Sequence, residues 1–102
     1  MYRLVVSELA HSDLDYIVSY IAVQLANPTA AANFLDEVEK CYGCLKNNPY
    51  MYERCQDAYL ERAGYHKATI KNYVLVYKVD EAARAVTIHR FFYGAQDYVK
   101  LI

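Results

Sequence analysis

The residues best suited to chemistry in this 102-residue chain are cations and proton-carrying side chains in its second half. Lys67, Lys71 and Arg90 could surround a phosphate, and Tyr93 or His66 could move a proton. Cleavage of RNA by its own 2′-hydroxyl needs a base, an acid for the leaving oxygen and cations around the phosphate. Alternation along a strand would put both lysines on one face. Lys67, Lys71, Arg90 and Tyr93 are therefore the candidate catalytic or target-contact residues.

Each candidate also has an ordinary structural role open to it. Both lysines could be solvated strand residues, and a lysine or tyrosine with its usual pKa of about 10 would need a large shift to act as a base. Arg90 could stack on the rings that follow it or grip an anion, or it could pair with an acidic neighbour such as Asp97. The 12 tyrosines could stack bases, but most are expected to be half-buried packing residues.

Cys41 and Cys44 have the spacing of redox and zinc motifs. They fall at the end of a predicted helix rather than at its start, and only Cys55 could add a third ligand. The sequence therefore indicates neither a metal nor a cofactor. Three cysteines without a dense spacing also favour reduced thiols over a disulfide framework.

Length and composition favour one domain over residues 1–102, because 56% hydrophobic residues can bury a core. No apolar run approaches the roughly 20 residues that span a bilayer, so we expect a cytoplasmic protein without membrane contact.

The net charge is −1, with −3 in residues 1–50 and +2 in 51–102. A protein that neutralises many phosphates usually has a more basic face.

The first half of the chain predicts a strand followed by two helices. Residues 1–6 are short, β-branched and apolar, which favours a strand. From about Glu8 to Ala26, apolar residues recur at helical spacing on one face (Ala10, Leu14, Ile17, Ile21, Leu25). Asn27 and Pro28 then predict the cap and first turn of a second helix that stops before Asn47. Its apolar face contains Ala31, Phe34, Leu35, Val38, Cys41, Tyr42 and Leu45. Two amphipathic helices joined by a short turn make an antiparallel hairpin.

The second half predicts a loop and three strands. Residues 47–64 lack a period, so we expect a connecting loop with one edge strand around Ala58 to Leu60. Three β-rich runs follow: Tyr65 to Lys71, Tyr73 to Val79 and Ala85 to Tyr93. The second run should lie centrally, with the helices on one face and aromatic side chains on the other. The apolar tail from Tyr93 to Ile102 should pack on the domain or meet a partner. The fold class is α+β, with an N-terminal strand, a helix hairpin and a mainly antiparallel curved sheet.

These elements, in this order, resemble the RelE/ParE superfamily of toxins from type II toxin–antitoxin systems over nearly the whole chain. Several local strings carry the resemblance. They are Ser7-Glu8-Leu9-Ala10 with Asp13-Leu14 and Tyr20-Ile21; Asn27-Pro28 with Ala31-Ala32 and Phe34-Leu35; Leu45 with Asn48-Pro49; Gly64-Tyr65-His66-Lys67; Asn72 through Asp80; and Ile88-His89-Arg90 through Tyr93-Gly94 to Gln96-Asp97-Tyr98.

The resemblance implies one of two mechanisms. RelE-like members cut messenger RNA in the ribosomal A site with basic residues on the concave sheet face, whereas ParE-like members are not nucleases and poison DNA gyrase. The RelE-like central strand carries an arginine where this chain has Val74. A related branch ends in arginine-tyrosine-histidine-tyrosine, and this chain has Phe92 at the histidine. Two residues expected for cleavage are therefore missing.

We therefore favour a ParE-like, non-nucleolytic toxin that inhibits growth, because of Val74, Phe92 and the near-neutral charge. The alternatives are a RelE-like, metal-independent mRNA endoribonuclease that depends on the ribosome, and an inactive homologue that only binds antitoxin. The implied partners are a cognate antitoxin, in a hetero-oligomeric complex, and either DNA gyrase or the ribosome with its mRNA as target.

Overall fold

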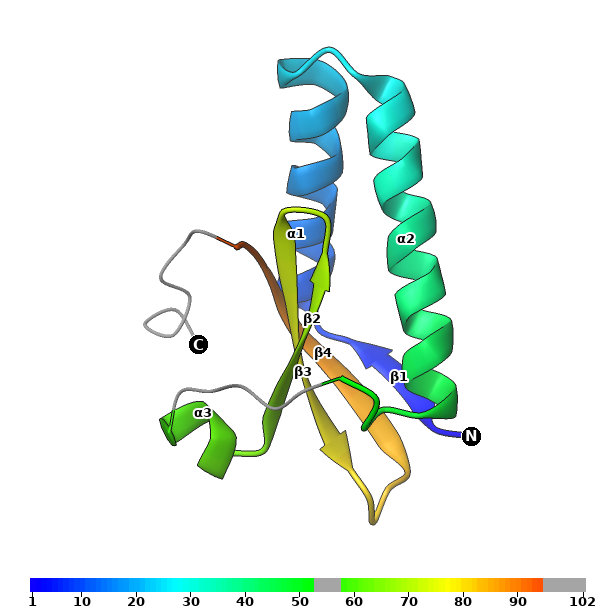
Figure 1. Cartoon of the computed structure of the whole chain (residues 1–102), viewed down its shortest axis with the longest axis vertical. Coiled ribbons are helices and arrows are strands. Elements are labelled where there is room, and N and C mark those ends of the chain that lie inside the picture. The colour runs from blue at the N-terminus through cyan, green and yellow to red at the C-terminus, as the bar shows by residue number, and fades with distance from the viewer. Residues whose placement is uncertain (53–57, 95–102) are drawn as a thin grey trace.

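A four-stranded sheet carries a helical hairpin on one face in the computed structural model, which describes residues 1–52 and 58–94 (Figure 1). The elements are β1 (Arg3–Val6), α1 (Glu8–Ser19), η1 (a π-helix, Tyr20–Gln24), α2 (Pro28–Asn47), α3 (Ala58–Arg62), β2 (Tyr65–Ile70), β3 (Tyr73–Asp80) and β4 (Ala85–Tyr93). The strand order is β1-β4-β3-β2, in which β1 is parallel to β4 and the other pairs are antiparallel. The predicted α+β architecture is confirmed.

Two side-chain caps start the helices of the hairpin. The Ser7 hydroxyl accepts a hydrogen bond of 3.0 Å from the amide of Ala10, and the side chain of Asn27 accepts one of 3.0 Å from the amide of Ala30. Pro28 is the first residue of α2, where its missing N–H costs nothing. The predicted cap and turn are confirmed, and the hairpin extends beyond the sheet at its turn end (Figure 1).

A π-helical turn ends the first arm of the hairpin. The amide of Leu25 donates to the carbonyl of Tyr20 at 3.0 Å, five residues back, so this turn is wider than an α-helical turn. Ile17 and Ile21 are buried as predicted. Leu25 was also expected on the buried face, and this prediction is wrong: its side chain is 55% exposed. Leu25 is the C-cap residue of η1 at the end of this arm, where it lines a groove with Ile17 instead of packing in the core.

The core lies between the hairpin and the inner face of the sheet. Its largest fully buried side chains include Phe34 and Leu45 from α2, Leu75 and Tyr77 from β3, and Ile88 from β4. Leu35 was expected on the buried face of α2 but is exposed, because Phe34 and Val38 take the inward positions. On the opposite face of the sheet Val74, Val76 and Phe92 are buried with Tyr65 packed against them. The central strand is thus covered on both faces, as predicted.

The edge strand predicted around Ala58 to Leu60 is wrong, because α3 occupies this segment. A strand there would need a sheet edge, and the backbone instead forms one turn of helix that buries Leu60. Gly64 then reverses the chain with a φ of 86°, and its amide donates to the carbonyl of Glu61 at 3.0 Å. Of the predicted tail from Tyr93 to Ile102, residues 95–102 lie outside the described residues, as do residues 53–57.

Lys71 was expected at the end of a strand but lies in the turn between β2 and β3. Ile70 pairs with Tyr73, which leaves only Lys71 and Asn72 to reverse the chain. Lys71 adopts a φ of 56°, a conformation that costs free energy in any residue with a Cβ. Strand alternation therefore does not set the direction of its side chain.

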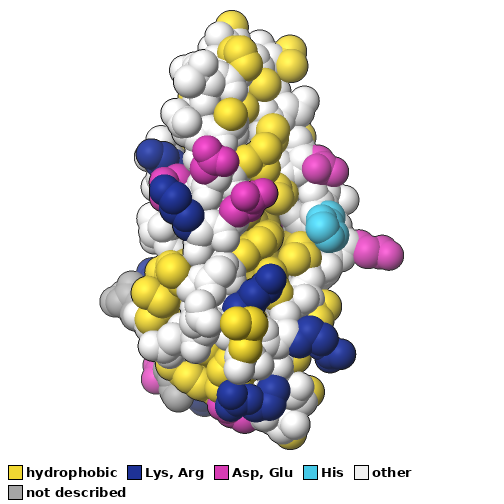
Figure 2. Space-filling view, turned by 90° about the vertical axis from the view of Figure 1, so that its right-hand side faces the viewer, with side chains coloured by type: hydrophobic (Ala, Val, Ile, Leu, Met, Phe, Trp, Pro, Cys, Tyr) yellow, Lys and Arg dark blue, Asp and Glu magenta, His cyan; other side chains and the backbone are white. Residues whose placement is uncertain are grey.

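Charged groups are unevenly spread over the surface. Figure 2 shows that the end formed by the turn of the hairpin carries only hydrophobic and uncharged polar side chains on that face, while charges gather lower down. Among the described residues, no helix combines the length and the hydropathy needed to cross a membrane.

Candidate functional site

Three of the four candidate residues lie around one hollow. Lys67 from β2, Lys71 from the following turn and Tyr93 from the end of β4 line a hollow of about 450 Å³ together with Thr69, Asn72, Val74 and Gly94. The amide of Gly94 donates to the carbonyl of Asn72 at 2.8 Å. A Cβ at Gly94 would lie 3.1 Å from that oxygen, so glycine permits the close approach of the two backbones.

Apolar side chains lie beneath this hollow. Val74 is 8% exposed and lies in the cluster with Val76 and Phe92. Val74 and Phe92 are the positions at which the RelE-like patterns have arginine and histidine. An aliphatic and a phenyl side chain can neither hold a phosphate nor carry a proton.

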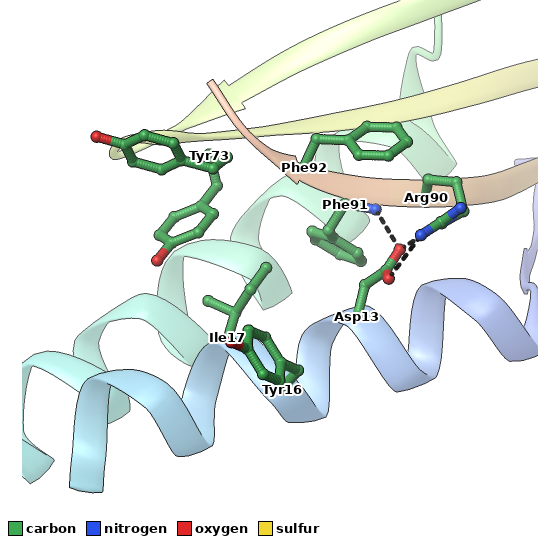
Figure 3. Close-up of a pocket in the computed structure, with 8 residues that line it drawn as sticks. Asp13, Tyr16, Ile17, Tyr73, Arg90, Phe91 and Phe92 are labelled. Atoms are coloured by element: carbon green, nitrogen blue, oxygen red, sulfur yellow. Dashed lines mark hydrogen bonds and ion pairs between the residues drawn. The ribbon is translucent and has the colours of Figure 1, made fainter. Parts of the chain in front are cut away.

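Arg90, the fourth candidate, lines a second hollow of about 230 Å³, where it is paired to Asp13 of α1 (Figure 3). Lys67 and Arg90 both pair with Val76 in the sheet, so they lie two strands apart at the same level. Its Nε donates to one carboxylate oxygen at 2.7 Å and a terminal nitrogen donates to the other at 3.1 Å. The amide of Phe91 donates to the same carboxylate at 3.0 Å. The guanidinium also lies 4.9 Å from the centre of the Phe92 ring. The hydrogen bond to Asp13 raises the pKa of Arg90 further, so this cation is already engaged within the protein.

Sequence reasoning missed Asp13 and offered Asp97 as the partner of Arg90; Asp97 lies outside the described residues. The sequence spacing does indicate that Asp13 faces the sheet. Ala10, Asp13 and Ile17 are separated by three and four residues, so they share one helical face. Ala10 and Ile17 are buried against the sheet. A carboxylate on that stripe needs a donor from the sheet, and Arg90 supplies it.

His66, considered as a proton carrier, faces the core rather than the hollow beside Lys67. Its ring stacks on Tyr77 with 5.3 Å between ring centres and an angle of 18°, and it meets Tyr50 edge-on at 5.9 Å. Strand alternation explains this placement, because neighbours in β2 point to opposite faces. The structure therefore does not bring His66 together with the other candidates.

An aromatic groove lies on the other side of Tyr93, and sequence reasoning did not find it. Tyr16, Ile17, Tyr20 and Leu25 from the first arm of the hairpin line about 610 Å³ of space with Asn72, Tyr73 and Tyr93. Tyr73 meets Tyr93 edge-on at 5.8 Å, and burial raises the pKa of Tyr73. The groove therefore offers an apolar surface with a few hydroxyls.

The cysteine pair has no metal-like arrangement among residues 1–52 and 58–94. Cys41 is buried in α2 and burial raises the pKa of its thiol, which disfavours the thiolate that binds metals. Cys44 is half-buried, and Cys55 lies outside the described residues. In this part of the chain, no three histidine, cysteine, aspartate or glutamate side chains are grouped to hold a metal ion.

The fold is shared with solved toxin–antitoxin systems. It matches a chain of a chromosomal ParDE system from P. aeruginosa with a TM-score of 0.72 and 19% identity, over 91% of this chain and 96% of that one. It also matches a chain of the RelBE2 complex from Mycobacterium tuberculosis with a TM-score of 0.63 and 22% identity, over 90% and 96%. No curated protein matches the sequence.

These two matches concern the fold alone. The model of one family, described as the ParE toxin of the type II toxin–antitoxin system parDE, matches residues 4–98. The chain belongs to this ParE toxin family, which confirms the resemblance.

Proposed function

We propose that this single-domain toxin stops bacterial growth by inhibiting DNA gyrase without cutting RNA, and that a cognate antitoxin neutralises it. The observation that carries the proposal is the ion pair of Asp13 and Arg90, which occupies a cation that cleavage would need. Membership of the ParE toxin family supports the same mode.

The free energies involved favour this reading. A charge-assisted contact to a developing oxyanion contributes about 3–4 kcal/mol to catalysis. If Arg90 turned to a phosphate, the partly buried Asp13 carboxylate would lose both hydrogen bonds from the guanidinium and keep only the Phe91 amide as donor, which costs about 1–3 kcal/mol. Much of the catalytic gain would be lost in that exchange. With Val74 and Phe92 in place of a cation and an imidazole, little remains for phosphate chemistry.

An antitoxin is supported as the partner by the family and by both solved relatives, which come from toxin–antitoxin systems. The exposed aromatic groove agrees with a toxin that works through protein contacts, because an apolar surface of this kind gains free energy when a protein covers it. We expect toxin and antitoxin to form a hetero-oligomer.

One observation favours the second candidate, ribosome-dependent cleavage of mRNA. Lys67, Lys71 and Tyr93 line a single hollow, as a phosphate site would require. In that case Lys67 and Lys71 would hold the phosphate and Tyr93 would move the proton. A third candidate, an inactive homologue that only binds antitoxin, predicts normal growth when the chain is expressed alone.

Two purified systems separate these functions. The toxin is added to gyrase with relaxed plasmid, and in parallel to ribosomes programmed with a message. We expect supercoiling to fall while the message stays intact. Lys67→Ala and Lys71→Ala test the hollow, and Lys40→Ala on the exposed side of α2 is the matched control. Efficient cleavage of the message, lost in both hollow variants but not in the control, would replace the gyrase proposal with the RelE-like one.

A further inference from the structure

Lys71 occupies a backbone conformation that lysine does not favour. It is one of the two residues in the turn between β2 and β3, and its φ is 56°. Hairpin turns this short commonly place glycine, asparagine or aspartate where φ is positive, because a larger side chain crowds the backbone there. The chain has asparagine at the next position, 72, and not at this one. Residues held in such a conformation occur preferentially where a protein binds or reacts.

No contact within the described part of the chain accounts for this lysine. Two charged residues there have a positive φ, Lys71 and Arg84. The guanidinium of Arg84 pairs with Glu81 at 3.5 Å and lies 4.2 Å from the centre of the Tyr2 ring, so the fold uses its side chain. The exposed side chain of Lys71 has no hydrogen bond, ion pair or ring contact with any residue that the structure describes. No such contact offsets its backbone conformation, and its ammonium group can meet a partner.

The position of Lys71 makes it part of a cationic hollow. Among the described residues, Lys67 and Lys71 are the charged side chains that line this hollow of about 450 Å³, and both are positive. The hydroxyls of Thr69 and Tyr93 and the side-chain amide of Asn72 add hydrogen-bond donors. Donors around two ammonium groups, with no carboxylate beside them, suit an anionic group of a partner.

An apolar surface adjoins this hollow and decides which anion fits. Asn72 and Tyr93 also line the aromatic groove with Tyr16, and Figure 1 shows the β2–β3 turn next to α1. In the described part of the chain, no charged side chain lines that groove. A nucleic-acid strand carries a phosphate at every nucleotide, so it would place some of them over uncharged rings. A protein segment can instead place one carboxylate in the hollow and apolar side chains in the groove.

We infer that Lys71 recognises an acidic side chain of gyrase that is flanked by apolar residues, and that the carboxylate of this side chain enters the hollow between Lys67 and Lys71. The inference rests on the proposed function, because it takes gyrase as the target. The turn keeps a residue that lowers stability because the charge of that residue contacts the target. Stability and inhibition therefore respond to Lys71 in opposite directions, which a purely structural lysine would not show.

Inhibition of supercoiling by purified gyrase, measured against toxin concentration, tests the inference. We expect Lys71→Asn to raise the concentration for half inhibition about fivefold, the effect of one lost exposed charge pair. The same variant should resist urea better than the wild type. Lys71→Arg keeps the cation and should inhibit as the wild type does. Lys40→Asn, on the exposed side of α2, is the matched control for the loss of one positive charge and should not change inhibition.

Binding measured without the reaction identifies the anion. Wild type and Lys71→Asn are each titrated with gyrase free of DNA, and with plasmid DNA free of gyrase. We expect Lys71→Asn to bind gyrase alone more weakly than the wild type does. This difference should shrink as the salt concentration rises from about 0.05 M to about 0.5 M, because salt screens exposed charges. A Lys71-dependent affinity for plasmid alone would assign the hollow to a phosphate and overturn the inference.

The wild-type result separates this inference from the proposed function. If wild type and Lys71→Asn inhibit gyrase at equal concentrations, the inference is wrong and gyrase remains the target. If the wild type neither binds nor inhibits gyrase, both are wrong. Urea unfolding of each variant shows that a weaker inhibitor is still folded.

Discussion

Asp13 of α1 and Arg90 of β4 form a bidentate ion pair, with 2.7 Å between Oδ2 and Nε. The two residues are 77 positions apart in the sequence. The same carboxylate accepts a hydrogen bond from the backbone amide of Phe91. The Asp13 side chain therefore links α1 both to the backbone of β4 and to the Arg90 side chain. Both side chains are mostly shielded from solvent, which limits screening of the pair.

Replacing Asp13 should therefore destabilise the protein. Asp13→Ala leaves the Arg90 guanidinium and the Phe91 amide without their acceptor, and we expect a loss of about 1–3 kcal/mol in the free energy of unfolding. Urea unfolding measures it. Asp15→Ala, on the exposed side of the same helix, is the control and should change stability by less than about 0.5 kcal/mol. Equal losses in the two variants would contradict a specific role for the pair.

The Glu81 carboxylate should make stability depend on acid. It accepts hydrogen bonds from the hydroxyls of Tyr2 and Tyr50 and pairs with Arg84, and the hydrogen bond from Tyr2 is the main reason why the pKa of Glu81 lies below its ordinary value of 4.5. A lowered pKa in the folded state stabilises fully above pH 4.5, and this contribution disappears as the pH falls through the folded pKa.

Glu81→Gln should flatten the dependence of the unfolding midpoint on pH below about 4.5, since no proton is then bound on acidification. Thermal melts across pH 3–7 measure the effect. Asp80→Asn, at the neighbouring position that ends β3, is a control for the removal of one negative charge. A slope unchanged by Glu81→Gln would show that other carboxylates dominate.

His89 should titrate below its ordinary pKa of 6.5. Burial is the main cause that lowers the pKa of His89, and the positive charge of Lys78 lowers it further. The unfolded chain therefore takes up the proton at a higher pH than the folded one, so stability falls as the pH drops below 6.5. NMR titration of the imidazole should give a midpoint below 6.5. Lys78→Met should raise this midpoint but leave it under 6.5, because the burial remains. A midpoint above 6.5 in the wild type would refute the assignment.

Lys71 should be replaceable with a gain in stability. Its φ of 56° is unfavourable for lysine, and asparagine tolerates this region better. We expect Lys71→Asn to raise the free energy of unfolding by up to about 1 kcal/mol, seen as a higher denaturation midpoint. Lys67→Asn, in the adjacent strand where φ is ordinary, should give no such gain. Destabilisation by Lys71→Asn would mean that the lysine side chain makes a contact that outweighs the backbone term.

The sequence alone determined the family and every element except α3, because these depend mainly on residues that are close along the chain. Asn27 and Pro28 define a cap and a helix start by local chemistry. The β-rich runs after Gly64 pair as predicted, since short turns leave neighbouring strands little choice of partner.

The tertiary structure decided what lies far apart in the sequence. The pairing of Asp13 with Arg90 follows from how α1 packs on β4, which no local pattern contains. The exposure of Leu25 depends on its place at the end of the hairpin's first arm, and the helical state of Ala58–Arg62 accompanies the burial of Leu60. In each case competing local preferences are nearly equal in free energy, so packing selects between them.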